Sequence, residues 1–206
     1  MKALVTGASG FVGGYLVSRL VAGGAEVLGL DAIVAKTIDG TGSGLTSGSF
    51  EIDGQMFPPL FPEEGAEIRQ CDLLDADALE RSVSEWGPDV IFHLAAQSSA
   101  ARSFGDPGGT MRTNVMGTLN LLEAVRRGGK ARVIVTGSAE EYGRRALDEM
   151  PLLESSPIEP VSPYATSKAA QNLLVMQYCR AFGIEVVATR SFSHTGPGQT
   201  TTFVLP

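Results

Sequence analysis

Few residues in this sequence could hold a metal ion or form a disulfide. Cysteine occurs only at positions 71 and 179, and histidine only at positions 93 and 194, each without a ligand-like partner nearby. This scarcity argues against a structural zinc site, a disulfide framework and a metal hydrolase. Apolar runs stay well short of the ~18 residues of a membrane span. The N-terminus lacks the charged and long apolar regions of a signal peptide, so we expect a cytoplasmic protein.

Positive charge is also scarce. The 206 residues carry 16 lysines and arginines against 23 aspartates and glutamates, for a net charge of −7. A surface of this sign argues against nucleic acid and anionic membranes as main partners, because both attract basic proteins. The length and the 43% content of hydrophobic residues predict a globular domain rather than a disordered chain. Glycine, in contrast, is abundant, with 25 residues.

Segments typical of strands and helices alternate along the chain. We expect strands at residues 3–6, 26–30, 67–70, 89–94, 132–136 and 185–189, and helices at residues 11–22, 75–85, 111–127 and 162–182. This order predicts an α/β fold with a doubly wound parallel sheet and helices on both faces. Residues 32–65 are rich in glycine, serine and threonine and far exceed the usual connection of about 2–6 residues. We interpret them as an insertion, with a small hairpin around residues 49–57.

A glycine loop lies between the first predicted strand and the first predicted helix. Gly7, Gly10 and Gly13 have the spacing GxxGxxG. Glycines here permit a tight turn and close backbone approach to a pyrophosphate, and the helix N-terminus offers N–H groups and a positive dipole end. The pattern predicts a Rossmann-type site for a dinucleotide cofactor. A tight strand–helix turn without a ligand is the alternative.

Two aspartates follow the next two predicted strands. Asp31 ends the second strand, where a carboxylate accepts hydrogen bonds from an adenosine ribose and repels a 2′-phosphate. The residue favours NAD as cofactor, with NADP as the alternative. Asp31 could instead be an ordinary N-cap or turn aspartate that binds neither. Asp72 follows the third strand and is a candidate for the adenine edge or, alternatively, a helix cap.

Three further side chains could carry acid–base chemistry. Tyr164 and Lys168 are spaced i, i+4, so they share one face of the predicted helix 162–182. A nearby ammonium stabilises a phenolate and lowers the pKa of the tyrosine, which could then exchange a proton with an alcohol or ketone. Ser138 follows the strand 132–136, at the sheet edge where its hydroxyl could bind the reacting oxygen. The alternatives are an ordinary surface pair and a capping serine.

Taken together, these motifs resemble the extended branch of the short-chain dehydrogenase/reductase family. The resemblance is carried by residues 6–13, 93–97, 114–118, 137–143, 164–168 and 196–199. Residues 138–143, 162–164 and 193–199 are most similar to the nucleotide-sugar enzymes of that family, in particular GDP-4-keto-6-deoxy-mannose reductases and GDP-mannose 4,6-dehydratases. The resemblance implies an NAD(P)-dependent oxidoreductase acting at C4 of a nucleotide-linked sugar.

The resemblance also implies roles for individual residues. Tyr164 would be the acid/base, Lys168 would hold the nicotinamide ribose, and Ser138 would bind the C4 oxygen. Glu140 matches a glutamate that helps dehydratases to remove water, although similar reductases carry it too. The implied cofactor contacts, beside Tyr164 and Lys168, are Gly7, Gly10, Phe11, Val12, Gly13, Asp31, Asp72, Leu73, Ala95 and Ala96. The implied substrate contacts, beside Ser138, are Asn114, Ser193 and His194.

The family pattern also bears on the organisation of the chain. Residues 1–206 would form the NAD(P)-binding domain, with residues 190–206 as the start of a substrate-binding part that is largely missing. Relatives usually form homodimers through the helix after Met111 and the helix that carries Tyr164, so we expect a homodimer. Epimerisation, dehydration and net reduction all remain open. A dinucleotide-binding module or fragment without turnover of its own is the alternative function.

Overall fold

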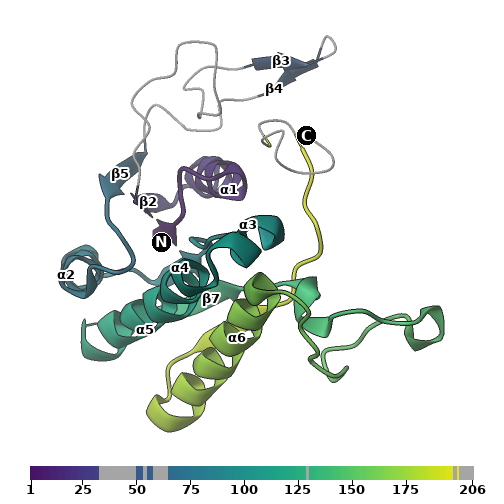
Figure 1. The fold of residues 1–206 in the computed structure, drawn as a ribbon. Coiled ribbons are helices and arrows are strands. Elements are labelled where there is room, and N and C mark those ends of the chain that lie inside the picture. Colours follow the sequence, from purple (N-terminus) through teal and green to yellow (C-terminus); the bar gives the residue numbers. More distant parts are fainter. Residues whose placement is uncertain (33–49, 53–54, 58–64, 129, 197–198, 200–206) are drawn as a thin grey trace.

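The computed structural model describes residues 1–206 except 33–49, 53–54, 58–64, 129, 197–198 and 200–206. Its main body is a six-stranded parallel sheet in the order β5-β2-β1-β6-β7-β8 (Figure 1). The order reverses between β1 and β6, where doubly wound sheets place their ligands. The predicted sheet is confirmed by six strands: β1 (Lys2–Thr6), β2 (Glu26–Asp31), β5 (Ala66–Gln70), β6 (Val90–His93), β7 (Arg132–Thr136) and β8 (Val186–Thr189).

Helices cover both faces of this sheet, because successive residues of a strand point to opposite sides. In β1, Leu4 packs into the core beneath α2, α5 and α6, whereas Val5 packs toward α1 around Val17. Figure 1 shows α1 apart from the group formed by α2, α5 and α6. The helices are α1 (Phe11–Ala22), α2 (Ala76–Trp86), α3 (Ala100–Gly105), α4 (Pro107–Met111), α5 (Gly117–Gly128) and α6 (Pro163–Phe182).

The ends of α6 match the sequence prediction. Ser162 is the N-cap, and its hydroxyl accepts a hydrogen bond from the Ala165 amide at 3.0 Å. Pro163 takes the first helical position, where its missing N–H costs nothing. The helix ends at Gly183, which has a left-handed φ of 68° that favours glycine. These residues define both ends of the helix that carries Tyr164.

The predicted helix 111–127 is wrong at its N-terminal end. The structure has the short helix α4, then a π-helical turn (Arg112–Met116), and only then α5. The apolar residues 111, 115 and 119 keep an α-helical spacing across the π-helical turn. The spacing therefore gives no sign that this turn contains one residue more than an α-helical turn. The sequence analysis also missed α3, which lacks an apolar stripe and begins at the capping residue Ser99. π-Helical turns often occur at functional sites.

The predicted hairpin is confirmed within the described part of residues 32–65. Strands β3 (Phe50–Ile52) and β4 (Gln55–Phe57) pair antiparallel, apart from the main sheet. Most of the remaining predicted insertion lies outside the described residues. In the described part of the chain, no helix combines the length and apolar character needed to cross a membrane.

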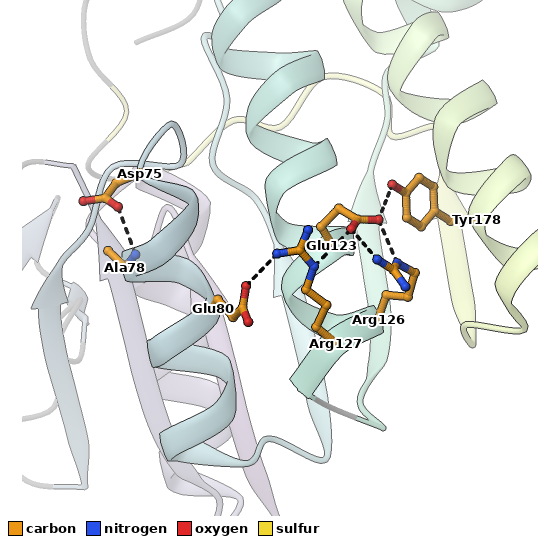
Figure 2. Close-up of polar contacts among 7 residues, drawn as sticks. All are labelled: Asp75, Ala78, Glu80, Glu123, Arg126, Arg127 and Tyr178. Atoms are coloured by element: carbon orange, nitrogen blue, oxygen red, sulfur yellow. Dashed lines mark hydrogen bonds and ion pairs between the residues drawn. The ribbon is translucent and has the colours of Figure 1, made fainter.

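A polar cluster ties α5 to its neighbours α2 and α6 (Figure 2). Glu123 on α5 accepts hydrogen bonds from Arg126 on the same helix and, at 2.6 Å, from the Tyr178 hydroxyl on α6. Arg127 reaches Glu80 on α2 at 3.2 Å. The bonds from Arg126 and Tyr178 lower the pKa of Glu123 to about 2. The charged form of Glu123 therefore helps to hold the helical layer together.

We expect Glu123→Gln to destabilise the fold by about 1 kcal/mol near neutral pH, as for other partly exposed charge networks. The pKa of Glu123 is lowered in the folded state, so its contribution is present above the ordinary glutamate pKa. It is lost as the pH falls toward 2. Urea unfolding of wild type and variant should therefore converge in acid. Glu185→Gln is the matched control, because Glu185 pairs with Arg132 where both side chains are exposed. A difference that stays constant with pH would contradict this role.

Candidate active site

The glycine loop connects β1 to α1 and is packed so closely that it leaves no space for side chains at Gly7 and Gly13. Gly7 has a φ of 71°, and a Cβ on it would press into the backbone of Ala95. A Cβ on Gly13 would collide with the carbonyl oxygen of Gly7 and the backbone of Ala8. Helix α1 begins after Gly10, and no described side chain caps it. Its first N–H groups are thus suited to bind an anion in the adjoining cleft.

One cleft of about 830 Å³ runs along the carboxyl ends of the strands. This volume lies in the range typical of small-molecule and cofactor sites. Sixteen of the predicted site residues line it, namely Gly7, Gly10, Phe11, Val12, Gly13, Asp31, Asp72, Leu73, Ala95, Ala96, Ser138, Glu140, Tyr164, Lys168, Ser193 and His194. The structure therefore brings the predicted phosphate, ribose, catalytic and substrate residues to a single place. Asn114 is the predicted residue that does not line the cleft.

The two predicted aspartates are held by nearby backbone. The Asp31 carboxylate accepts a hydrogen bond from the Ser9 amide at 2.9 Å, which ties the end of β2 to the glycine loop. Asp72 accepts from the Leu74 amide at 2.9 Å, so it shapes the turn after β5. Asp72 lines the cleft, and the N-cap of α2 is Asp75 instead.

Tyr164 and Ser138 both line the cleft, and their side chains are hydrogen-bonded to each other. Tyr164 is 8% exposed, and its amide donates to the Ser103 hydroxyl of α3 at 3.1 Å. Burial raises the pKa of Tyr164, a hydrogen bond from Ser138 lowers it, and the charges of Glu140 and Glu141 raise it further. The net effect is a raised pKa, so the predicted lowering by Lys168 is not found. The reason is that burial disfavours the charged phenolate.

Lys168 is held by neutral groups. The residue is 3% exposed, and its ammonium donates to the Thr136 carbonyl at 2.8 Å and to the Gln171 side chain at 3.0 Å. Burial lowers the pKa of Lys168 to about 8, and the charge of Glu141 counteracts this. Lys168 thus has a fixed position at the cleft and a pKa below that of an ordinary lysine.

Asn114 lies in the π-helical turn, fully buried behind the cleft. Its side-chain amide donates to the Ser167 hydroxyl at 2.8 Å and to the Gln97 carbonyl, and its oxygen accepts from the Gln97 amide. Asn114 thereby connects α6, between Tyr164 and Lys168, to the segment that follows β6. In this structure it supports the walls of the cleft and does not face its interior.

The sequence analysis missed a buried network around His93. The ring contacts the hydroxyls of Thr6 at 2.7 Å and Thr118 at 2.8 Å. The Thr118 hydroxyl donates to the Asn114 carbonyl, so it accepts from His93 and the Nε2 atom carries the proton. Burial and the charge of Lys168 lower the pKa of His93 to about 3. The neutral His93 ring therefore connects the end of β1, directly before the glycine loop, to α5.

The parallel sheet, with a glycine loop at its strand-order reversal, has the Rossmann-type α/β architecture, and a buried Tyr–Lys pair lines the same cleft. The model of the GDP-mannose 4,6 dehydratase family matches residues 4–206, so the chain belongs to this family. The predicted resemblance to the nucleotide-sugar enzymes of the extended short-chain dehydrogenase/reductase family is confirmed.

Individual relatives differ in the reaction that their names state. The chain is 36% identical to a UDP-glucose 4-epimerase of Mycolicibacterium smegmatis, over 97% of the chain and 58% of that protein. It is 34% identical to a GDP-mannose 4,6-dehydratase of Yersinia enterocolitica, over 98% and 52%. The solved dTDP-glucose 4,6-dehydratase DesIV of Streptomyces venezuelae, with NAD bound, matches with a TM-score of 0.81 and 31% identity, over 100% and 60%. The chain thus spans about half the length of these relatives.

Proposed function

We propose that the chain binds NAD in this cleft and oxidises or reduces C4 of a nucleotide-linked sugar. The observation that carries the proposal is the shared cleft itself. The glycine loop and Asp31 line one part of it, and Ser138, Tyr164 and Lys168 line another. The names of the relatives, which state epimerases and dehydratases of UDP-, GDP- and dTDP-sugars, support the same substrate class.

The residues present fit a dinucleotide. The tight backbone at Gly7 and Gly13 leaves the loop without side chains at the point where a pyrophosphate would approach. The N-terminus of α1 favours its negative charge. Asp31 would accept the ribose hydroxyls, and Leu73 with Asp72 would flank the adenine. The carboxylate of Asp31 favours NAD over NADP, because it would repel a 2′-phosphate.

The reacting part of the site would be formed by α6 and the turn after β7. A bound nicotinamide supplies the hydride acceptor or donor. Tyr164 would take or give the proton of the C4 oxygen, Ser138 would bind that oxygen, and Lys168 would hold the nicotinamide ribose. With cofactor and sugar displacing solvent from the cleft, the Lys168 ammonium would also stabilise the phenolate.

The neighbouring residues would contact the sugar. Ser193 and His194 line the cleft in the segment after β8, where we place the start of the substrate-binding part, residues 190–206. Glu140 would help to remove water if the reaction is a dehydration. Asp31 favours the reactions that recycle NAD, whereas the likeness to reductases favours net reduction.

We also propose that the protein is a cytoplasmic homodimer. The support is the exposed apolar surface of α6, where Leu173 and Met176 are 67% and 40% exposed. Pairing α5 and α6 with those of a second copy would bury these side chains and stabilise the dimer. Sedimentation as a monomer at every concentration would contradict the homodimer.

The cofactor preference is tested by calorimetric titration with NAD and NADP. We expect wild type to bind NAD at least ~10-fold more tightly than NADP, the factor expected from about 1.4 kcal/mol of discrimination. Asp31→Asn keeps an acceptor for the Ser9 amide but removes the charge, so it should weaken this preference. Asp77→Asn, in the first turn of α2, is a surface control. Tighter binding of NADP by wild type would overturn the assignment.

A further inference from the structure

Glu141 is a buried carboxylate that the proposed function does not use. It lies in the 3₁₀ turn Ala139–Tyr142, directly after Ser138, and is 0% exposed. A buried charge costs several kcal/mol unless it is paired and hydrogen-bonded. A carboxylate buried at this position therefore needs partners that offset the cost of its burial.

The carboxylate joins three elements of the site. One oxygen, Oε1, accepts from the Ser138 amide at 2.8 Å. The other oxygen, Oε2, accepts from the Asn172 side chain on α6 at 3.1 Å and pairs with Arg190, after β8, at 3.4 Å. The turn with Ser138, the helix with Tyr164 and the segment leading to Ser193 are thus held by one side chain.

These contacts determine how the chain passes through Ser138. The residue has an extended backbone, and its hydroxyl accepts from the Glu140 amide at 3.2 Å. Just before it, a Cβ on Gly137 would collide with the Thr189 carbonyl oxygen and press on Oε1 of Glu141. Just after it, the Ala139 amide donates to the Ser191 carbonyl at 2.9 Å. The position of the Ser138 hydroxyl therefore depends on the carboxylate behind it.

The charge of Glu141 also acts on the acid–base pair. Tyr164 faces Ser138, Glu140 and Glu141 on the turn, and the negative charge raises its pKa. Lys168 faces the Thr136 carbonyl on β7, His93 on β6, Gln171 on its own helix and the Glu141 carboxylate. Burial lowers the pKa of Lys168 to about 8, and Glu141 opposes this. The carboxylate thus helps the buried lysine to stay charged at neutral pH.

We propose that Glu141 is a positioning residue that fixes Ser138 relative to Tyr164. Arg190 and Asn172 belong to the same device, because they hold the second oxygen of the carboxylate. The catalytic meaning of this device rests on the proposed function, whereas its geometry and charge do not.

The test is a titration of the tyrosines by NMR in protein labelled with ¹³C at the tyrosine ring. The chain has four tyrosines, and the Tyr164 signal is assigned by its absence in Tyr164→Phe. Glu141→Gln keeps an acceptor for the Ser138 amide and removes the charge. We expect it to lower the Tyr164 titration midpoint by about one pH unit, a typical effect of a nearby charge. Arg190→Gln removes the positive partner and should raise the midpoint.

A shift of opposite sign in the two variants supports the device, and unchanged midpoints overturn it. If Glu141→Gln does not fold, Arg190→Gln and Asn172→Leu measure the same coupling from the other side. Glu185→Gln, at a carboxylate that pairs with Arg132 on the exposed surface, is the control and should leave the midpoint unchanged. The titration needs neither cofactor nor sugar. A failure of the wild type to bind NAD would therefore contradict the proposed function but not the positioning role of Glu141. Where turnover is measurable, Glu141→Gln should lower kcat about 10-fold with KM for NAD within about twofold.

Discussion

Replacing Tyr164 with phenylalanine should lower sugar turnover by about 10²- to 10⁴-fold, the usual contribution of a positioned acid or base. The change deletes only the hydroxyl, which meets Ser138 in the cleft. The ring keeps its packing, so NAD binding should change little. Comparison of kcat with the dissociation constant for NAD separates the two effects.

Tyr178→Phe is the matched control for this variant. Tyr178 lies on the same helix α6, but its hydroxyl donates to Glu123 away from the cleft (Figure 2). We expect it to affect stability and to leave turnover near the wild-type value. If Tyr164→Phe retained full turnover, Tyr164 could not be the group that moves the proton.

A second large effect is expected at the glycine loop. The Cβ of Gly13→Ala would collide with the Gly7 carbonyl oxygen and lie against Ala8, so the loop must move. Overpacking of this kind typically costs about 1–3 kcal/mol, and the shifted loop would no longer fit a pyrophosphate. We expect NAD affinity to fall at least ~100-fold, measured by calorimetry below the melting temperature of the variant.

Gly105→Ala controls for the loss of a glycine as such. A Cβ at this position on α3 meets open space, so stability and NAD affinity should stay close to wild type. A Gly13→Ala protein that binds NAD as tightly as wild type would show that the cofactor lies elsewhere.

The sequence predicted the fold well because its signals are local. The strand residues alternate between the two cores, and caps such as Ser162 and Gly183 mark the ends of α6 in the sequence itself. The site could be predicted for a related reason, since parallel strands bring their carboxyl ends to one edge. The π-helical turn at Asn114 escaped, because apolar spacing does not report a single extra residue.

The partners of the buried polar groups could not be predicted. Lys168 binds a carbonyl 32 residues away, and Glu141 binds Asn172, 31 residues away. Such contacts depend on how β7 and α6 pack, not on local spacing. The same holds for the pKa of Tyr164, where the i, i+4 lysine suggested a lowered value and burial produces a raised one. The sequence identified the ionisable side chains of the site, and their packing determined their pKa values.

The most direct test of the account is the absorbance of reduced nicotinamide when the chain and NAD are mixed with UDP-glucose, GDP-mannose or dTDP-glucose. Oxidation at C4 is the step that epimerisation and dehydration share, and both reactions later return the hydride to the sugar. In a single turnover with protein in excess, at least one sugar should therefore produce the reduced cofactor transiently, together with an epimerised or dehydrated sugar product. For net reduction, NADH supplied with a 4-keto-6-deoxy sugar should be consumed. Both signals should be lost in Tyr164→Phe. Tight NAD binding with neither a transient absorbance change nor a new sugar product, with every sugar, would contradict the enzyme and leave a dinucleotide-binding module.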